Sequence, residues 1–120
     1  MIGRMSEAPF ANTPEPPYVA VIFTSTRTEG DNGYAVMAES INELVSKQPG
    51  FLGMEEARDG LGITVSYWAD HEAARAWKDV AAHVVAQRRG REVWYEDYRV
   101  RVATVERDYD MSSSVLRHEP

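Results

Sequence analysis

The chain has 120 residues, 43% of them hydrophobic, a formal net charge of -6 and no cysteine. The length suits one domain with one core, and the missing cysteine excludes disulfides, thiolate metal sites and a cysteine nucleophile. The net negative charge argues against nucleic acid or an anionic membrane as a partner. The start lacks the apolar run of a signal peptide and no apolar run could span a bilayer, so we expect a cytoplasmic protein.

The first half of the chain predicts an arm, a strand and a helix. Residues 1–17 contain four prolines and are expected to form a flexible or extended arm. The apolar, partly β-branched run at residues 18–23 predicts a strand that is buried on both faces and that residues 24–28 extend. The turn at residues 30–33 follows, where Asp31 or Asn32 can cap a helix with apolar positions between residues 34 and 45. Pro49 and Gly50 end that helix.

The second half predicts a hairpin, a helix and a last strand. Two short extended runs, residues 51–58 and 61–68, surround Asp59-Gly60, a pair typical of tight hairpin turns. Asp70 can cap a second helix, whose apolar positions recur at helical spacing between residues 73 and 85. Residues 98–105 predict the final strand. We therefore assign residues 18–109 to one domain and residues 110–120 to a polar tail.

This β-α-β-β-α-β order predicts an α+β, ferredoxin-like fold, in which two helices cover one face of a four-stranded antiparallel sheet. The first and last strands carry apolar residues at successive positions, so the helix-free face is apolar as well. A second copy of the chain, packed sheet against sheet, would cover it, and we expect a homodimer. If Val19, Val21 and Phe23 lie under the helices, Ala20 and Ile22 lie in that interface.

The stretch from His83 to Tyr98 concentrates cationic and aromatic side chains and is the first candidate for a site. His83 could act as a general base, because imidazole titrates near neutral pH, and Gln87 lies one turn further on, where it could hold the ring. The alternative is a structural histidine. Arg88 could bind a carboxylate or an oxyanion. Alternatively, the arginines of this stretch pair with Glu92 and Glu96.

Aromatic residues could form the wall of a pocket for a planar substrate. Tyr67 and Trp68 end a strand just before a helix cap, where a pocket rim is expected. Trp77 falls on the core-facing stripe of its helix, which favours a core position over a binding role. The three histidines are scattered, so we expect no metal site.

Six segments of the chain resemble the antibiotic biosynthesis monooxygenase (ABM) domain family. They are the strand YVAVIF at 18–23, the turn TEGDNGY at 28–34, QPGFLG at 48–53, ITVSYW at 63–68, AWK at 76–78 and QRRGREVWY at 87–95. The resemblance covers about residues 18–109. It implies a dimeric α/β barrel made of two ferredoxin-like units.

The family resemblance also implies chemistry. Its members include small oxygenases that oxidise phenols or quinols without metal or flavin, and haem-degrading oxygenases. The haem-degrading members use a first-strand asparagine with a tryptophan and a histidine of the second helix. Trp77 and His83 match by type, but residues 18–27 contain no asparagine. The cofactor-free oxygenases use an asparagine near the substrate together with tryptophan, tyrosine and arginine. Trp68, Tyr67 and Arg88 are matches by type, but no asparagine lies near the strand at residues 61–68.

The sequence thus favours a cofactor-independent monooxygenase that acts on a small aromatic, quinol-like molecule in a pocket between the sheet and the helices. Two alternatives stay open. One is a non-catalytic, dimeric ligand-binding or stress-associated module of the same fold, since one fold hosts many functions. The other is a haem-binding or haem-degrading protein with His83 as the axial ligand.

Overall fold

The computed structural model describes residues 10–87 and 91–112. Its elements are β1 (Tyr18–Arg27), α1 (Tyr34–Val45), β2 (Phe51–Asp59), β3 (Leu61–Trp68), α2 (His71–Gln87), α3 (Arg91–Trp94) and β4 (Tyr95–Val105). The predicted β-α-β-β-α-β order is confirmed. The four-residue α3 is an addition that the sequence pattern does not indicate, and β4 begins three residues before the predicted start.

Local hydrogen bonds and a glycine turn determine where several of these elements begin and end. The Asp31 carboxylate accepts hydrogen bonds from the backbone N–H groups of Gly33 and Ala35, at 3.0 and 3.1 Å, and so caps α1. Asp70 accepts one from Ala73 at 2.8 Å and caps α2. Gly60 joins β2 to β3 with a φ of 80°, a conformation that glycine adopts without steric cost. Both predicted caps and the predicted hairpin are confirmed.

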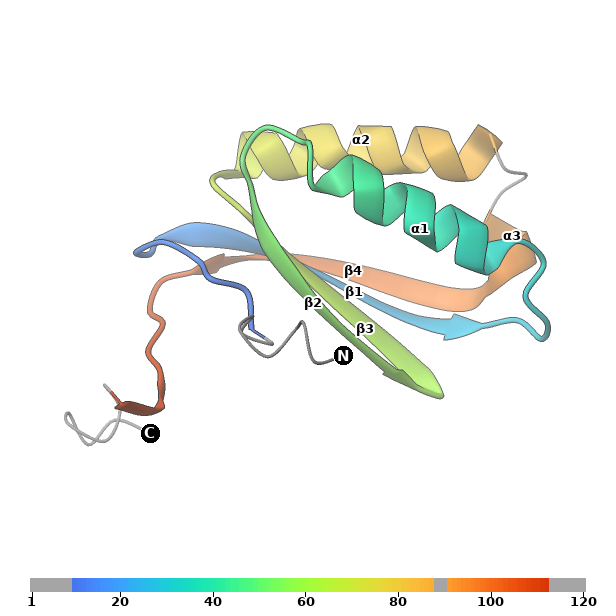
Figure 1. The fold of residues 1–120 in the computed structure, drawn as a ribbon, viewed down its shortest axis with the longest axis horizontal. Coiled ribbons are helices and arrows are strands. Elements are labelled where there is room, and N and C mark those ends of the chain that lie inside the picture. Colours follow the sequence, from blue (N-terminus) through green and yellow to red (C-terminus); the bar gives the residue numbers. More distant parts are fainter. Residues whose placement is uncertain (1–9, 88–90, 113–120) are drawn as a thin grey trace, which may run out of the picture.

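The four strands form one sheet in the order β2-β3-β1-β4, with every neighbouring pair antiparallel. Figure 1 shows α1 and α2 side by side over one face of this sheet. Residues alternate between the two faces along each strand. Val19 and its partner Trp68 point toward the helices, whereas Tyr18 and Tyr67, one residue earlier in each strand, lie on the helix-free face.

The core lies between the helices and the sheet. Val19, Val45, Trp68 and Ala74 form its buried cluster, against which further half-buried side chains pack: Val21, Phe51, Met54, Ala73 and Trp77. Val19 and Val21 are therefore under the helices. The register thus places Ala20 and Ile22 on the helix-free face, as the sequence predicts.

The segments that flank the sheet also lie on its helix-free side. Figure 1 shows the chain before β1 and the chain after β4 both running below the sheet, opposite the helices. Among the described residues, no helix is long and apolar enough to cross a membrane.

Candidate functional site

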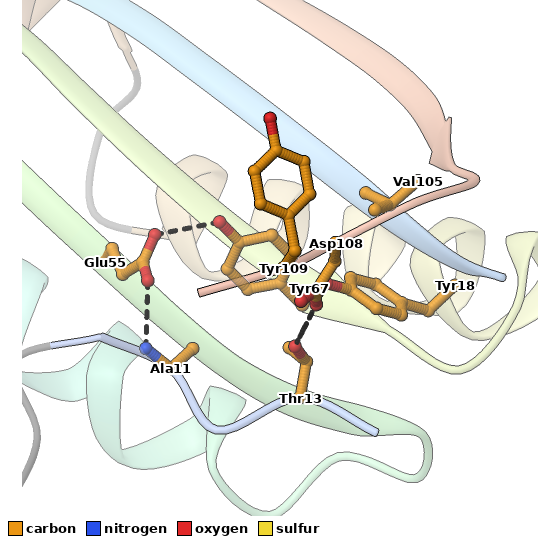
Figure 2. A pocket seen from close by; sticks show the side chains of 8 residues that line it. All are labelled: Ala11, Thr13, Tyr18, Glu55, Tyr67, Val105, Asp108 and Tyr109. Carbon is orange, nitrogen blue, oxygen red and sulfur yellow. Dashed lines mark hydrogen bonds between the residues drawn. The ribbon is translucent and has the colours of Figure 1, made fainter. Parts of the chain in front are cut away.

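A hollow of about 270 Å³ lies on the helix-free face, where β1 begins and β3 and β4 end. Figure 2 shows side chains from both flanking segments and all four strands converging on it. Its lining residues are Ala11, Thr13, Tyr18, Glu55, Tyr67, Val105, Asp108 and Tyr109. We refer to this hollow as the Tyr18–Tyr67 pocket.

Glu55 connects one wall of the pocket to the N-terminal segment. The Tyr67 hydroxyl donates to Glu55 Oε1 at 2.8 Å, and the Ala11 backbone N–H donates to Glu55 Oε2 at 2.9 Å. One carboxylate therefore accepts hydrogen bonds both from a phenol of the sheet and from the backbone of the N-terminal segment that crosses over the sheet. Charge-assisted hydrogen bonds of this kind are stronger than neutral ones.

Asp108 connects the opposite wall to both flanking segments. The Tyr18 hydroxyl donates to Asp108 Oδ2, and the Thr13 hydroxyl lies 3.0 Å from the Tyr18 oxygen and 3.1 Å from the same Oδ2. The two phenol rings meet edge to face, with centroids 5.8 Å apart and planes at 85°. The pocket is thus lined by two tyrosine–carboxylate pairs, Tyr67 with Glu55 and Tyr18 with Asp108, and the two tyrosine rings are in contact.

This environment keeps both phenols protonated. Burial, followed by the hydrogen bond to Glu55, raises the pKa of Tyr67 to about 12. Burial and then the hydrogen bond to Asp108 raise the pKa of Tyr18 as well. A ligand in the pocket would meet two neutral phenols and two acidic side chains. The phenol rings can pack against an aromatic ligand, and the carboxylates can accept its protons.

The structure brings one of the predicted substrate-binding residues, Tyr67, into this pocket. Trp68 is fully buried at 0% exposure, and its indole N–H donates to the Ser66 hydroxyl at 2.9 Å. Trp77 stacks on Trp68 with centroids 6.0 Å apart and packs against the core. Alternation along the strand explains the difference, because neighbours in β3 point to opposite faces.

The predicted base lies elsewhere. His83 is exposed on α2, which covers the other face of the sheet, and no residue of α2 is among those that line the pocket. Gln87 ends α2, but its side chain is outside the described part of the structure, as is all of Arg88. The roles predicted for these three residues stay predictions.

The expected aromatic wall is divided among three places. Trp68 and Trp77 are in the core, and Tyr67 is on the helix-free face. The other aromatic residues gather near the N-terminus of α1, where Tyr95 packs edge to face on Phe23 and Tyr34, with centroids 5.4 and 5.9 Å apart. Burial raises the pKa of Tyr95 there.

Sequence reasoning missed Tyr18, Glu55 and Asp108. For Tyr18, a signal was present: antiparallel pairing brings the start of β1 next to the end of β3, so Tyr18 and Tyr67 share a face whenever Val19 and Trp68 share the core. Asp108 gives no such signal, because it follows the last strand and its position depends on how that segment folds back. Within the described residues, no group of His, Asp or Glu side chains is arranged to hold a metal ion.

Comparison with known proteins supports the fold. No family model matches the chain. It is 31% identical over 91 residues to a protein named jasmonate monooxygenase ABM from Pyricularia oryzae, covering 72% of this chain but 42% of that protein. A solved variant of SnoaB, a cofactor-independent oxygenase from Streptomyces nogalater, matches with a TM-score of 0.63 at 13% identity, over 76% of this chain and 95% of that one.

The fold that the resemblance to the antibiotic biosynthesis monooxygenase domain family implies is confirmed, and the chain is similar in sequence to a protein that carries this family's name. Its relatives also include YqjZ of Bacillus subtilis, an uncharacterized protein. The two are 52% identical over 99 residues, which cover 81% of this chain and 87% of YqjZ.

Proposed function

We propose that this protein is a small monooxygenase that uses dioxygen directly on an aromatic, quinol-like molecule bound in the Tyr18–Tyr67 pocket. The observation that carries the proposal is the convergence of two phenol rings and two carboxylates in one hollow on the sheet face. A relative named as a monooxygenase and a solved structure named as a cofactor-independent oxygenase support this class of reaction.

The chemistry balances without an external reductant. A hydroquinone and one dioxygen give a hydroxyquinone and one water, so one oxygen atom enters the ring and the ring supplies all the electrons. Removal of a phenolic proton makes the ring electron-rich and starts the reaction. A carboxylate within hydrogen-bond reach of that proton is a suitable general base.

We also propose that the working protein is a homodimer joined through the helix-free face. A row of apolar side chains crosses this face, among them Ile63, 40% exposed, and Leu61, 50% exposed. By register, Arg99 and Arg101 of β4 flank this row on one edge of the face, and Glu55 of β2 lies at the other. Two copies in antiparallel contact would bring opposite charges together and cover the pocket.

Oxygen uptake with a panel of hydroquinones and anthrones tests the activity. We expect uptake by the wild type, loss of most of it in Asp108→Asn, and retention in His83→Ala. If His83→Ala abolishes uptake and Asp108→Asn leaves it unchanged, the reaction occurs at α2 and not in the pocket. No uptake by a folded protein with any member of the panel would refute the proposed activity.

A second function is favoured by one observation. Both oxygens of Glu55 and Oδ2 of Asp108 already accept protein donors, an arrangement that suits a stable binding module as well as a reactive site. Such a module would gain thermal stability from a quinol that it leaves unchanged. Turnover of the stabilising ligand would exclude this alternative.

A further inference from the structure

Rows of side chains cross the helix-free face perpendicular to the strands, and one row has opposite charges at its two ends. From β2 through β3 and β1 to β4, the register places in this row Glu55, Val65, Ile22 and Arg101. Its acidic end lines the Tyr18–Tyr67 pocket, and its basic end is an exposed arginine. We refer to it as the Glu55–Arg101 row.

The two neighbouring rows toward the β2–β3 hairpin lack this property. The first runs from Ala57 to Arg99, so its positive end has an uncharged residue at the other end. The second ends in Asp59 and Asp97, which are both acidic. Arg101 and Arg99 are exposed arginines on the same face of β4, and they differ in what lies at the opposite end of their rows.

Two copies in antiparallel contact run their strand orders in opposite directions, so β4 of each copy lies over β2 of the other. A two-fold axis along the strands does this and keeps every residue at its own level. Each Glu55 then faces Arg101 of the second copy. Packed sheets usually cross at about 30°, which shifts their edges by roughly 4 Å. Neighbouring rows are about 7 Å apart, so Arg101 remains nearer to Glu55 than Arg99 does.

Glu55 can accept this second partner. Its two oxygens each accept one donor, from Tyr67 and from Ala11, and a carboxylate offers about four acceptor positions. The N-terminal segment approaches on the Gly53 side, where a Cβ would lie 2.8 Å from the Ala11 Cβ. Ala57, one row further on, is exposed, so a side chain from a second copy can reach the carboxylate on that side.

From these observations we infer that the pocket is shared between two copies: the second copy's Arg101 forms an ion pair with Glu55 and completes the wall that Glu55 and Tyr67 begin. The inference rests on the proposed homodimer and names the residue that one copy supplies to the site of the other. Assembly and ligand binding then strengthen each other. A guanidinium at this wall also stabilises the negative charge that a quinol acquires when it loses a proton.

Reversing the two charges in separate variants tests the shared wall. Homodimers of Arg101→Glu bring two negative charges together, and homodimers of Glu55→Arg bring two positive charges together. A mixed dimer of the two variants joins opposite charges at both contacts. We would purify each variant, mix them, and measure association by sedimentation and native mass spectrometry, with circular dichroism to follow folding.

We expect each variant alone to self-associate at least about a hundredfold more weakly than the wild type, because a symmetric dimer contains the contact twice and each reversal weakens it about tenfold or more. Mixing should give a folded mixed dimer, even if a variant alone does not fold. Arg99→Glu is the matched control and should weaken association by less than about tenfold.

Three results would overturn the inference. They are wild-type association of either variant alone, a mixture that forms no mixed dimer, and an effect of Arg99→Glu as large as that of Arg101→Glu.

Hydroquinone binding, measured by calorimetry without oxygen, tests whether the ion pair belongs to the pocket. Arg101→Glu should bind at least about tenfold more weakly than the wild type, because the second copy no longer closes the site. One pocket of the mixed dimer keeps both native residues, so the mixed dimer should bind with wild-type affinity at half of its sites. Wild-type affinity of Arg101→Glu alone would show that the pocket is not shared.

Oxygen uptake separates this inference from the proposed function. A mixed dimer that binds hydroquinone without oxygen uptake would refute the monooxygenase and leave the shared pocket in place. Uptake by the wild type, together with a mixture that forms no mixed dimer, would do the reverse.

Discussion

The phenol of Tyr67 combines partial burial with a hydrogen bond to a carboxylate, and both favour its neutral form. Its pKa is about 12, against an ordinary value of 10.0. In the unfolded chain the same phenol would ionise near its ordinary value. Between these two pH values the folded protein keeps a proton that the unfolded chain has lost, so stability must fall as pH rises through this range.

We predict that replacing Tyr67 with Phe removes this pH-dependent part of the free energy of unfolding. The midpoint of urea unfolding should drop more steeply for the wild type than for Tyr67→Phe as the pH rises from 10 to 12. Glu55→Gln should lower the pKa of Tyr67 in a spectrophotometric titration, because it removes a negative hydrogen-bond acceptor. Identical pH profiles for wild type and Tyr67→Phe would contradict the assignment.

Trp68 illustrates how one position in a strand decides between pocket and core. It lies next to Tyr67, yet its ring is enclosed by Phe51 and Trp77. We predict that Trp68→Phe lowers the free energy of unfolding by at least about 2 kcal/mol, through lost ring volume and a lost hydrogen bond to Ser66. Quinol affinity should stay unchanged, measured by calorimetry on the folded variant.

The exposed residue Val36 provides the control for that change. Val36→Ala should alter stability by less than about 0.5 kcal/mol. A Trp68→Phe variant that is as stable as the wild type but has lost ligand affinity would place Trp68 at the pocket after all.

At the scale of elements, local patterns predicted most of the fold. The Asp59-Gly60 pair predicted the hairpin to within a residue, and the helical spacing of apolar residues identified both long helices. The path of the flanking segments could not be predicted, because it depends on contacts between residues far apart in sequence. Ala11 reaches Glu55, and Thr13 reaches Asp108, 95 positions away. The site lies where these segments meet the sheet, so its residues were largely missed.

Gly53 controls how closely the N-terminal segment approaches β2. Its φ is 150°, and a Cβ built there would lie 2.8 Å from the Ala11 Cβ. We predict that Gly53→Ala pushes this segment off the sheet and destabilises the protein more than Gly60→Ala does. At Gly60, φ is 80° and a Cβ would meet nothing within 4 Å, so that variant carries backbone strain of about 1 kcal/mol without a clash.

A double-mutant cycle isolates the contact with Ala11. Ala11→Gly should cost little by itself but recover at least about 0.5 kcal/mol in the Gly53→Ala background, as measured by urea unfolding. Strictly additive effects would show that the two residues do not meet.

At the scale of the whole molecule, the helix-free face decides the assembly. Ile63 is 40% exposed in the isolated chain, so a charge there costs little unless a partner covers it. Packing two such faces would bury on the order of 2,000 Å² in total, the range of obligate homodimers. Successive apolar residues in β1 and β4 predicted this surface from sequence, whereas its charged edges follow from the strand order.

We predict that the wild type sediments as a dimer at micromolar concentration and that Ile63→Glu dissociates or unfolds it. Val36→Glu, a charge on the exposed side of α1, should leave the dimer intact. A folded wild-type monomer at this concentration would refute the homodimer.

The central claim is that an aromatic ligand binds between Tyr18 and Tyr67 on the helix-free face of the sheet. A crystal structure of the protein soaked with hydroquinone in the absence of oxygen tests it most directly. We predict electron density for the ring beside these two phenols, with one hydroxyl in hydrogen-bond contact with Asp108 Oδ1. Density for the ring under the helices, beside Phe23 and Tyr95, with the Tyr18–Tyr67 pocket empty, would contradict the claim.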